Sequence, residues 1–482
     1  MNYSRLIKEI IFKEIITNLS NLRFAIGSLL IILTSVVAVL ITSLNYQEEL
    51  NDYHQSLKSQ DEAIAKYAHL NRIWSFVNPI VPPSDFSPIV QLRRADSSDS
   101  MFEDNGISSL ISTLDLILIT GILLSLLAIL FSYDSVSGER EDGTLKLVLS
   151  NHLPRPLLLT GKWIGGTLTI WAPYLIMLFV VAILLLMNPT LQWDESHWLS
   201  FLLIGVAGLI YLSLFYLVGM LCSILSRNSG TSILISLFIW VVFVLVIPNT
   251  SPFLAAQLIE VPSVFKIEKE TRRITGIERD NIIRSNSKAL IRQYDDRYNI
   301  HAEEILRLSQ EDQKRLITQT PELDGIIRKL RSELDNIVTE ANKHQDKIAE
   351  SLSENLRLRS IQQTKLSTQI ASLSPYASFL FITTNLSDNG LNKAGNENRQ
   401  SEAYTNILSE YLQKKKEEAQ KADATFNENS YIDLKDRPRF IYQPETISDR
   451  VKNTTSYWGI LIIFNGVLLL VSFIAFNRYD IR

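Results

Sequence analysis

Six long apolar segments constrain this chain more than any other feature of its sequence. A helix needs about 20 predominantly apolar residues to cross a hydrocarbon core of ~30 Å, and each segment is close to that length or longer. Backbone polar groups must be paired inside a bilayer, so uninterrupted apolar segments of this kind are typical of transmembrane helices. We therefore predict an all-α membrane protein with six transmembrane helices, at residues 24–44, 107–132, 163–187, 198–225, 232–250 and 457–477.

The overall composition averages two different kinds of region. Apolar residues make up 46% of the 482 residues and charged residues 20%, and the net charge of -4 gives no indication of nucleic-acid binding. The single cysteine, Cys222, lies inside an apolar segment. One cysteine forms no internal disulfide and no CxxC metal site, so Cys222 is interpreted as a packing residue.

The first 23 residues are amphipathic. A cleavable signal peptide would place a short apolar core near its start and end in small residues, which this stretch does not do. We predict instead an interfacial helix that lies along the membrane surface. Its apolar residues are Ile7, Ile10, Ile11, Ile15, Ile16 and Leu19, and its charged residues are Arg5, Lys8, Lys13 and Glu14.

Two polar regions separate the apolar segments. Residues 45–106 are acidic and proline-containing, and they are predicted to be a loop that begins with a helix. Residues 251–456 form a long insert with apolar residues at helical intervals, such as Ile326, Leu330 and Leu334. We expect long antiparallel helices with a coiled-coil-like seam there, and a new element starting at Ser374-Pro375.

The distribution of basic residues predicts the orientation, because Lys and Arg in short loops stay on the cytoplasmic side. With six spans, the basic residues of the N-terminal segment, of residues 133–162, of the turn at Arg227 and of the C-terminus all fall on one side. Both termini are therefore predicted to be cytoplasmic. The rule does not count long domains, so span parity places the loop at 45–106 and the insert at 251–456 outside.

Residues 133–162, which we call the signature loop, form a polar island between two spans. Glu139, Glu141 and Asp142 cluster where a short helix is expected to start, because acidic groups favour the positive end of the helix dipole. Gly143 and Thr144 precede an apolar run, and Pro154 is expected to stop the helix. The prediction is a short acidic helix, partly apolar, that fits a groove on a cytosolic partner.

The string GEREDGTLKLVLS, followed by Arg155 and Gly161-Lys162, resembles the signature loop of ABC-2 type transporter permeases. The resemblance is closest to the branch of copper-enzyme-maturation and gliding-type permeases. The chain has His152 where that family often has a proline, with Pro154 instead, so the exit angle of the short helix differs. The implied coupling residues are Glu139, Arg140, Glu141, Gly143, Thr144, Leu145, Val148 and Arg155.

The resemblance implies a permease subunit of an ATP-driven exporter. The chain has no GxxxxGK[ST] loop, so ATP and Mg would be bound by a separate ABC ATPase subunit and this chain is expected to be neither an enzyme nor a cofactor protein. A second permease, identical or homologous, would complete a dimer in the lipid bilayer. In the family, spans two and five line the path between subunits. The corresponding residues here are Ser112, Thr113, Thr120, Ser125, Ser232 and Ser236.

Two further groups of residues were considered as sites. A carboxylate within a span marks a pathway by default, which makes Asp115 a candidate, but the same residue could simply lie at headgroup depth. The six histidines are scattered along the sequence, so no local metal site is predicted, copper included.

A second function remains open on the sequence alone. The chain could be a non-transporting membrane scaffold whose outside helical domain engages a periplasmic protein partner, with the ATPase driving mechanical signalling. In either case the expected location is a bacterial inner membrane, crossed several times. The sequence does not identify a transported substrate.

Overall fold

The computed structural model describes residues 3–67, 69, 73, 76–91, 115–150, 154–261, 264–320, 322–423, 426 and 430–478. Regular structure in these ranges is helical, apart from one isolated bridge between His69 and Tyr431. Six helices are long and apolar enough to cross a membrane. The predicted all-α fold with six spans is thereby confirmed at the level of length and composition.

The helices divide between two compact units, one of residues 1–249 and 371–482 and the other of residues 250–370. The first unit holds α1 (Tyr3–Leu19), α2 (Leu22–Tyr67), α4 (Leu116–Leu118), the π-helix η2 (Ile119–Leu124), α5 (Ser125–Ser132), α6 (Ser137–Glu141), α7 (Thr144–Ser150), α8 (Arg155–Leu186), α9 (Glu195–Leu225), α10 (Ser229–Trp240), the π-helix η3 (Val241–Val246), α16 (Pro375–Leu386), α17 (Leu391–Ala422) and α18 (Ile447–Asn477). The second unit is made of α11 (Ile247–Leu258), α12 (Val264–Tyr298), α13 (Ala302–Arg307), α14 (Gln310–Gln319) and α15 (Glu322–Ala371), apart from the outermost residues of α11 and α15.

Helix α9 is the centre of the first unit. It contacts α5, α8, α10, α16 and α18. Its residues Tyr211–Leu217 are almost completely buried, with Tyr211, Phe215 and Tyr216 among the largest fully buried side chains. A helix that is apolar on every side is expected to lie inside a bundle, and α9 does so.

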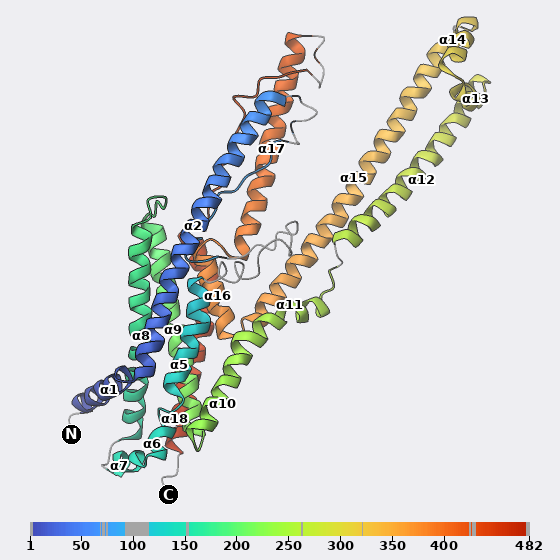
Figure 1. Cartoon of the computed structure of the whole chain (residues 1–482). Helices are drawn as coiled ribbons and strands as arrows, with labels where there is room; N and C mark the ends of the chain where they lie inside the picture. Colours follow the sequence, from blue (N-terminus) through green and yellow to red (C-terminus); the bar gives the residue numbers. More distant parts are fainter. Residues whose placement is uncertain are drawn as a thin grey trace. The chain divides into compact units, whose positions relative to one another are not determined.

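Helix α16 lies in this bundle rather than in a separate insert. Phe379, Ile382 and Leu386 are buried in the main core cluster, and the ring of Phe379 stacks on Tyr211 at 4.7 Å between centroids. Helix α16 contacts α9, and Figure 1 shows the two helices next to each other. Ser374 caps α16, so the start predicted at Ser374-Pro375 is confirmed. The prediction that residues 251–456 form one domain differs from the structure, because the apolar face of α16 packs in the bundle.

The helix that contains the first predicted span does not end with it at residue 44. Helix α2 continues to Tyr67, because no residue between 45 and 67 is a proline or glycine that would stop it. Beyond the apolar part, Ile64 of α2 belongs to a second core cluster with Tyr404, Leu408 and Leu412 of α17, and Figure 1 shows these two helices next to each other. The loop at 45–106 and the last part of the insert therefore pack together, which the sequence did not indicate.

Three other helices also extend beyond the spans predicted within them. Helix α8 begins at Arg155, so Gly161 and Lys162 lie inside it and Pro154 is its N-cap rather than the end of the preceding helix. The helix of the fifth span continues past Pro248 and Pro252 to Leu258, with η3 ending two residues before Pro248. Local π-helical bonding lets a membrane helix accommodate a proline that lacks an N–H donor. Helix α18, which contains the sixth predicted span, begins at Ile447, ten residues before that span.

The second unit contains the long antiparallel helices that the helical spacing predicted. Tyr294 and Leu330 share a small core, and the guanidinium Nε of Arg279 donates to Asn342 Oδ1 at 2.7 Å. Closer to the base of the hairpin, Gln363 of α15 donates to the carbonyl of Ile259 at 2.7 Å. From Ile259 through α12 to Tyr294 the residue numbers increase while those of their partners on α15 decrease, as an antiparallel hairpin requires.

Close packing of α5 on α9 gives a first testable prediction. A Cβ at Gly219 would lie 1.9 Å from Ser132 Oγ and 3.3 Å from the carbonyl oxygen of Ile129. We expect Gly219→Ala to lower the free energy of unfolding by about 1–3 kcal/mol, because overpacking forces the two helices apart. The measurement is the temperature at which the detergent-solubilised protein loses its monodisperse size-exclusion peak.

Gly466 in α18 provides the matched control, because a Cβ there meets no atom within 4 Å. Gly466→Ala should leave the transition temperature unchanged or raise it slightly, since alanine favours helix over glycine. Equal effects of the two substitutions would contradict the packing argument.

Candidate functional site

The signature loop folds as two short helices instead of one. Helix α6 ends at Glu141 and α7 begins at Thr144, and Gly143 between them has φ +73°. This left-handed conformation is readily adopted by glycine and strained for most other residues. The predicted single helix over residues 139–150 is therefore interrupted at Gly143. The Thr144 hydroxyl donates back to the carbonyl of Glu139 at 3.1 Å and fixes the angle between the two helices.

Glu139 is part of a group of four charges, of which Lys162, Glu14 and Glu139 are largely buried and Lys13 is exposed. Lys162 Nζ lies 3.0 Å from Glu139 and 3.4 Å from Glu14 of α1, and Lys13 Nζ lies 3.3 Å from Glu139. The Lys162 side chain is only 4% exposed. A buried charge is tolerated only when it is paired, so each of these groups depends on the others. The group joins α1, α6 and α8.

Arg140 and Glu141 connect α6 to the neighbouring helix ends. The Arg140 guanidinium donates to the carbonyls of Ser226 and Ile224 at the end of α9. The positive charge of Arg140 also interacts favourably with the negative, C-terminal end of the α9 dipole. Glu141 accepts hydrogen bonds from the backbone N–H and the hydroxyl of Ser229, at 2.9 and 3.0 Å, at the start of α10.

Two more contacts complete the connections of the loop. Arg155 donates to the carbonyl of Asn477 at 2.7 Å, at the end of α18. The Ser223 hydroxyl of α9 accepts from the backbone N–H groups of Val136 and Ser137, both at 2.9 Å. The signature loop is thus bonded to α1 and to the ends of α9, α10 and α18, at the end of the bundle where Figure 1 shows α6 and α7.

The exposed side of α7 differs from the one expected. Leu145 is 2% exposed and belongs to the main core, while Val148 and Leu149 are partly buried against it. These apolar residues therefore anchor α7 to the bundle. Leu147, by contrast, is 69% exposed, and Thr144 and Lys146 of the same helix are exposed as well. A surface for a partner would be centred on Leu147.

Asp115 has a structural role that the sequence left open. It is the N-cap of α4, with its side chain accepting from the backbone N–H of Leu118 at 2.8 Å and of Gln91 at 3.1 Å. A carboxylate at an N-cap satisfies amides that would otherwise lack a partner. Both oxygens are used in this way, which favours the capping interpretation over a pathway role.

The other residues predicted to line a pathway are buried within the chain, where the structure describes them. Thr120, Ser125, Ser232 and Ser236 are all at most 1% exposed. The Ser125 and Ser236 hydroxyls donate to carbonyls of their own helices, at 2.6 and 2.8 Å. Ser112 and Thr113 lie outside the described residues. Of these residues, Ser125 joins spans two and five, because its hydroxyl oxygen accepts from the indole N–H of Trp240 at 2.9 Å.

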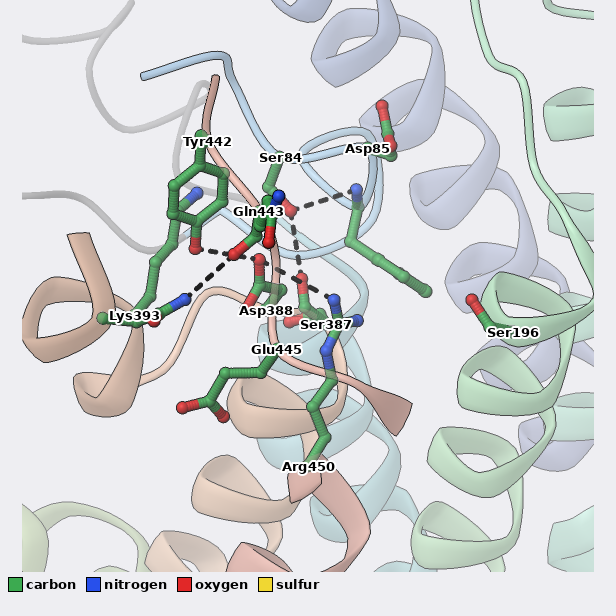
Figure 2. A network of polar contacts seen from close by, with 12 residues as sticks. Ser84, Asp85, Ser196, Ser387, Asp388, Lys393, Tyr442, Gln443, Glu445 and Arg450 are labelled. Atoms are coloured by element: carbon green, nitrogen blue, oxygen red, sulfur yellow. Dashed lines mark hydrogen bonds and ion pairs between the residues drawn. The ribbon is translucent and has the colours of Figure 1, made fainter. Parts of the chain in front are cut away.

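A polar network at the opposite end of the bundle was not anticipated from the sequence. Arg450 of α18 lies 3.8 Å from Asp388, and Tyr442 donates to Asp388 at 3.3 Å (Figure 2). Burial raises the pKa of Asp388, although Arg450 and Lys393 oppose that rise. Ser84 donates to the carbonyl of Ser387 at 3.0 Å, so the network fastens the end of α16 to a loop more than 300 residues earlier.

The only sequence signal for this network was weak. Asp388 has φ 51°, a conformation that aspartate and asparagine adopt more readily than most residues, and it is followed by Asn389-Gly390. That pattern indicates a turn but does not identify Arg450 as a partner. Among the described residues, His, Cys, Asp and Glu form no group that could hold a metal ion.

The buried charges around Lys162 give a second prediction. Lys162→Met would leave the carboxylates of Glu14 and Glu139 next to each other without their shared cation. We expect the free energy of unfolding to fall by about 3–5 kcal/mol, as is typical when one partner of a buried ion pair is removed. The same size-exclusion assay measures it.

Two further variants test whether the effect comes from charge. Combining Lys162→Met with Glu14→Gln and Glu139→Gln should recover part of the lost stability, because the repulsion is then removed. Lys146→Met, at an exposed position of α7, should have no effect on stability. No recovery in the triple variant would show that Lys162 acts through packing alone.

Comparison with known proteins agrees with the signature-loop resemblance. A family model described as ABC-2 family transporter protein matches residues 9–481. A search of curated proteins gave no match. The family match extends through the signature loop, the six candidate spans and the long insert. Because it covers nearly the whole chain, this protein is a member of the ABC-2 transporter family.

Proposed function

We propose that this protein is the membrane-spanning permease subunit of an ATP-driven exporter, and that it is coupled to a separate ABC ATPase subunit through α6 and α7. The observation that carries the proposal is the position of the signature loop. It is bonded to α1, α8, α9, α10 and α18 while it also presents an exposed apolar residue, Leu147. Such an element can receive force from a partner and distribute it to several spans.

The mechanism follows from which contacts are internal and which are exposed. Glu139 and Glu141 are engaged within the chain, so they would transmit motion instead of binding the ATPase. The docking surface would consist of Leu147 with the exposed residues Asp142 and Lys146 around it. ATP binding closes the ATPase dimer, α7 moves with it, and the internal bonds of α6 pull on α9 and α10.

Transport would take place between this chain and a second permease subunit. Much of the surface of the candidate spans is available for lipid or for a partner. In the most apolar 18-residue stretch of the fifth span only 22% is buried within the chain, and in that of the sixth span only 17%. The dimer, the bacterial inner membrane and the cytoplasmic position of both termini belong to this proposal.

In the second candidate function the chain is still coupled to an ATPase, but it transports no solute. The hairpin of α12 and α15, with 35 and 50 residues, is a compact unit of its own and would be exposed on the outside. It could engage a periplasmic protein, so that ATP-driven motion is passed to that protein. Reconstituted vesicles separate the two functions: solute flux that requires ATP supports export, and ATP-dependent remodelling of a bound protein without flux supports the scaffold.

Docking through Leu147 gives a third prediction. Leu147→Asp should reduce co-purification of the ATPase at least tenfold, because burial of a leucine contributes about 1.5–3 kcal/mol to an interface. Ile441→Asp is the matched control, since Ile441 is 75% exposed and lies before α18, away from the signature loop. Undiminished co-purification with Leu147→Asp would refute docking at this position.

The orientation gives a fourth prediction. In a Cys222→Ser background, a membrane-impermeant thiol reagent should label Asp142→Cys only from the cytoplasmic side and Lys343→Cys only from the other side. Both positions are exposed in the structure. Labelling of both from the same side would contradict the six-span topology on which the proposed coupling depends.

A further inference from the structure

Spans two and five share an unusual feature where they meet α16. Each contains one π-helical segment, η2 at Ile119–Leu124 and η3 at Val241–Val246, and both segments contact α16. A π-turn accommodates an extra residue in the helix, and this insertion weakens the regular hydrogen bonding between residues four apart. Such turns often occur at functional positions. Because both π-turns contact the same helix, they can be expected to act together.

Hydroxyl groups from neighbouring helices bond to both segments. The Tyr211 hydroxyl of α9 donates to the carbonyl of Gly121 in η2 at 2.6 Å. The Ser374 hydroxyl, which caps α16, donates to the carbonyl of Phe243 in η3. The ring of Tyr376 lies against Gly121, where a Cβ would be only 2.4 Å from it. The conformation of each π-segment is therefore held from outside its own span.

Helix α5, which follows η2, and helix α10, which precedes η3, are linked to each other at two places. Next to the π-segments, the indole N–H of Trp240 in α10 donates to Ser125 Oγ in α5 at 2.9 Å. At the far end, Glu141 accepts from Ser229, and the hydroxyls of Ser137 and Ser229 lie 3.2 Å apart. Helix α5 is thus joined to α10 directly at Ser125 and, at the far end, through α6, which follows α5 in the chain.

We propose that α5 and α10 move as one rigid pair, with η2 and η3 as its two hinges and with Tyr211 and Ser374 as the positioning residues that hold those hinges. The pair is joined to α6 of the signature loop, so a displacement of that loop would reach both hinges together. This inference concerns motion of the chain itself and depends on neither an ATPase nor a transported substrate.

The π-turns make a rotation of the pair feasible. When a π-turn converts to α-helix, one residue is transferred along the helix, which corresponds to about 100° of rotation and 1.5 Å of rise. A joined pair can rotate only if both hinges respond. Loss of one hydroxyl bond should therefore loosen the π-segment that it contacts and also the other one.

Hydrogen exchange of the full-length protein in nanodiscs tests this coupling. Tyr211→Phe removes only the hydroxyl that bonds η2, and Ser374→Ala removes the hydroxyl that bonds η3. Each should speed amide exchange about tenfold in peptides covering residues 119–124 and in those covering 241–246, as expected for loss of one buried hydrogen bond. Ser374→Thr retains a hydroxyl and should exchange like the wild type.

A purely structural role predicts a different pattern. Faster exchange confined to the segment that has lost its own hydroxyl bond would overturn the proposal, as would no change in either segment. Tyr174→Phe is the matched control, because Tyr174 is equally buried but lies against Gly208, away from both π-segments. It should alter exchange in neither.

The bond between Trp240 and Ser125 provides an independent check through a double-mutant cycle. In a Trp240→Phe background the two helices lose their link next to the hinges. The effect of Tyr211→Phe should then be confined to residues 119–124. Undiminished spread to residues 241–246 would show that α5 and α10 do not move as a rigid pair through this link.

Discussion

The pairing of Lys162 with Glu139 and Glu14 is the constraint on which the rest of the structure depends. A lysine inside an apolar helix cannot be kept charged and dry without carboxylates close by. The two carboxylates come from different parts of the chain, one from the first helix and one from the signature loop. The ion pairs of Lys162 with these two carboxylates therefore hold α1 against α8 and place α6 at the end of the bundle. Arg140 and Glu141 then follow on the same short helix, facing the ends of α9 and α10.

This arrangement changes how the acidic residues of the loop are understood. An acidic cluster on a short surface helix suggests an attraction to a basic partner, yet Glu139 is 19% exposed at its side chain and already paired twice within the chain. Glu141 is exposed but bonded to Ser229. The residues able to meet a partner are their neighbours Asp142 and Leu147. Coupling in this protein would then combine an apolar contact with the ATPase and an ionic connection to the spans, two tasks performed by different residues of one loop.

The sequence was sufficient for the features that depend on local pattern and insufficient for those that depend on distant contacts. Apolar segment length predicted six spans, and helical spacing predicted the long helices of the insert. Helix ends were misjudged where an amphipathic or polar stretch simply continued a helix, as α2 does to Tyr67. The burial of α16 could not be predicted, because its sequence between Pro375 and Leu386 is too short to span a bilayer and its partner Tyr211 is far away along the chain. The pairing of Asp388 with Arg450 could not be predicted either, because the two residues are far apart along the chain.

The position of α16 also has a consequence for biosynthesis. Tyr211 and Phe379 stack in the centre of the bundle, but about 170 residues of chain separate them. At 5–20 residues per second, a ribosome needs roughly 10–30 s to make that stretch. During this interval the nascent α9 has no α16 to cover Tyr211, and the hairpin of α12 and α15 is completed first. The order of synthesis therefore makes the hairpin an early product and closure of the bundle core a late event in maturation of the protein.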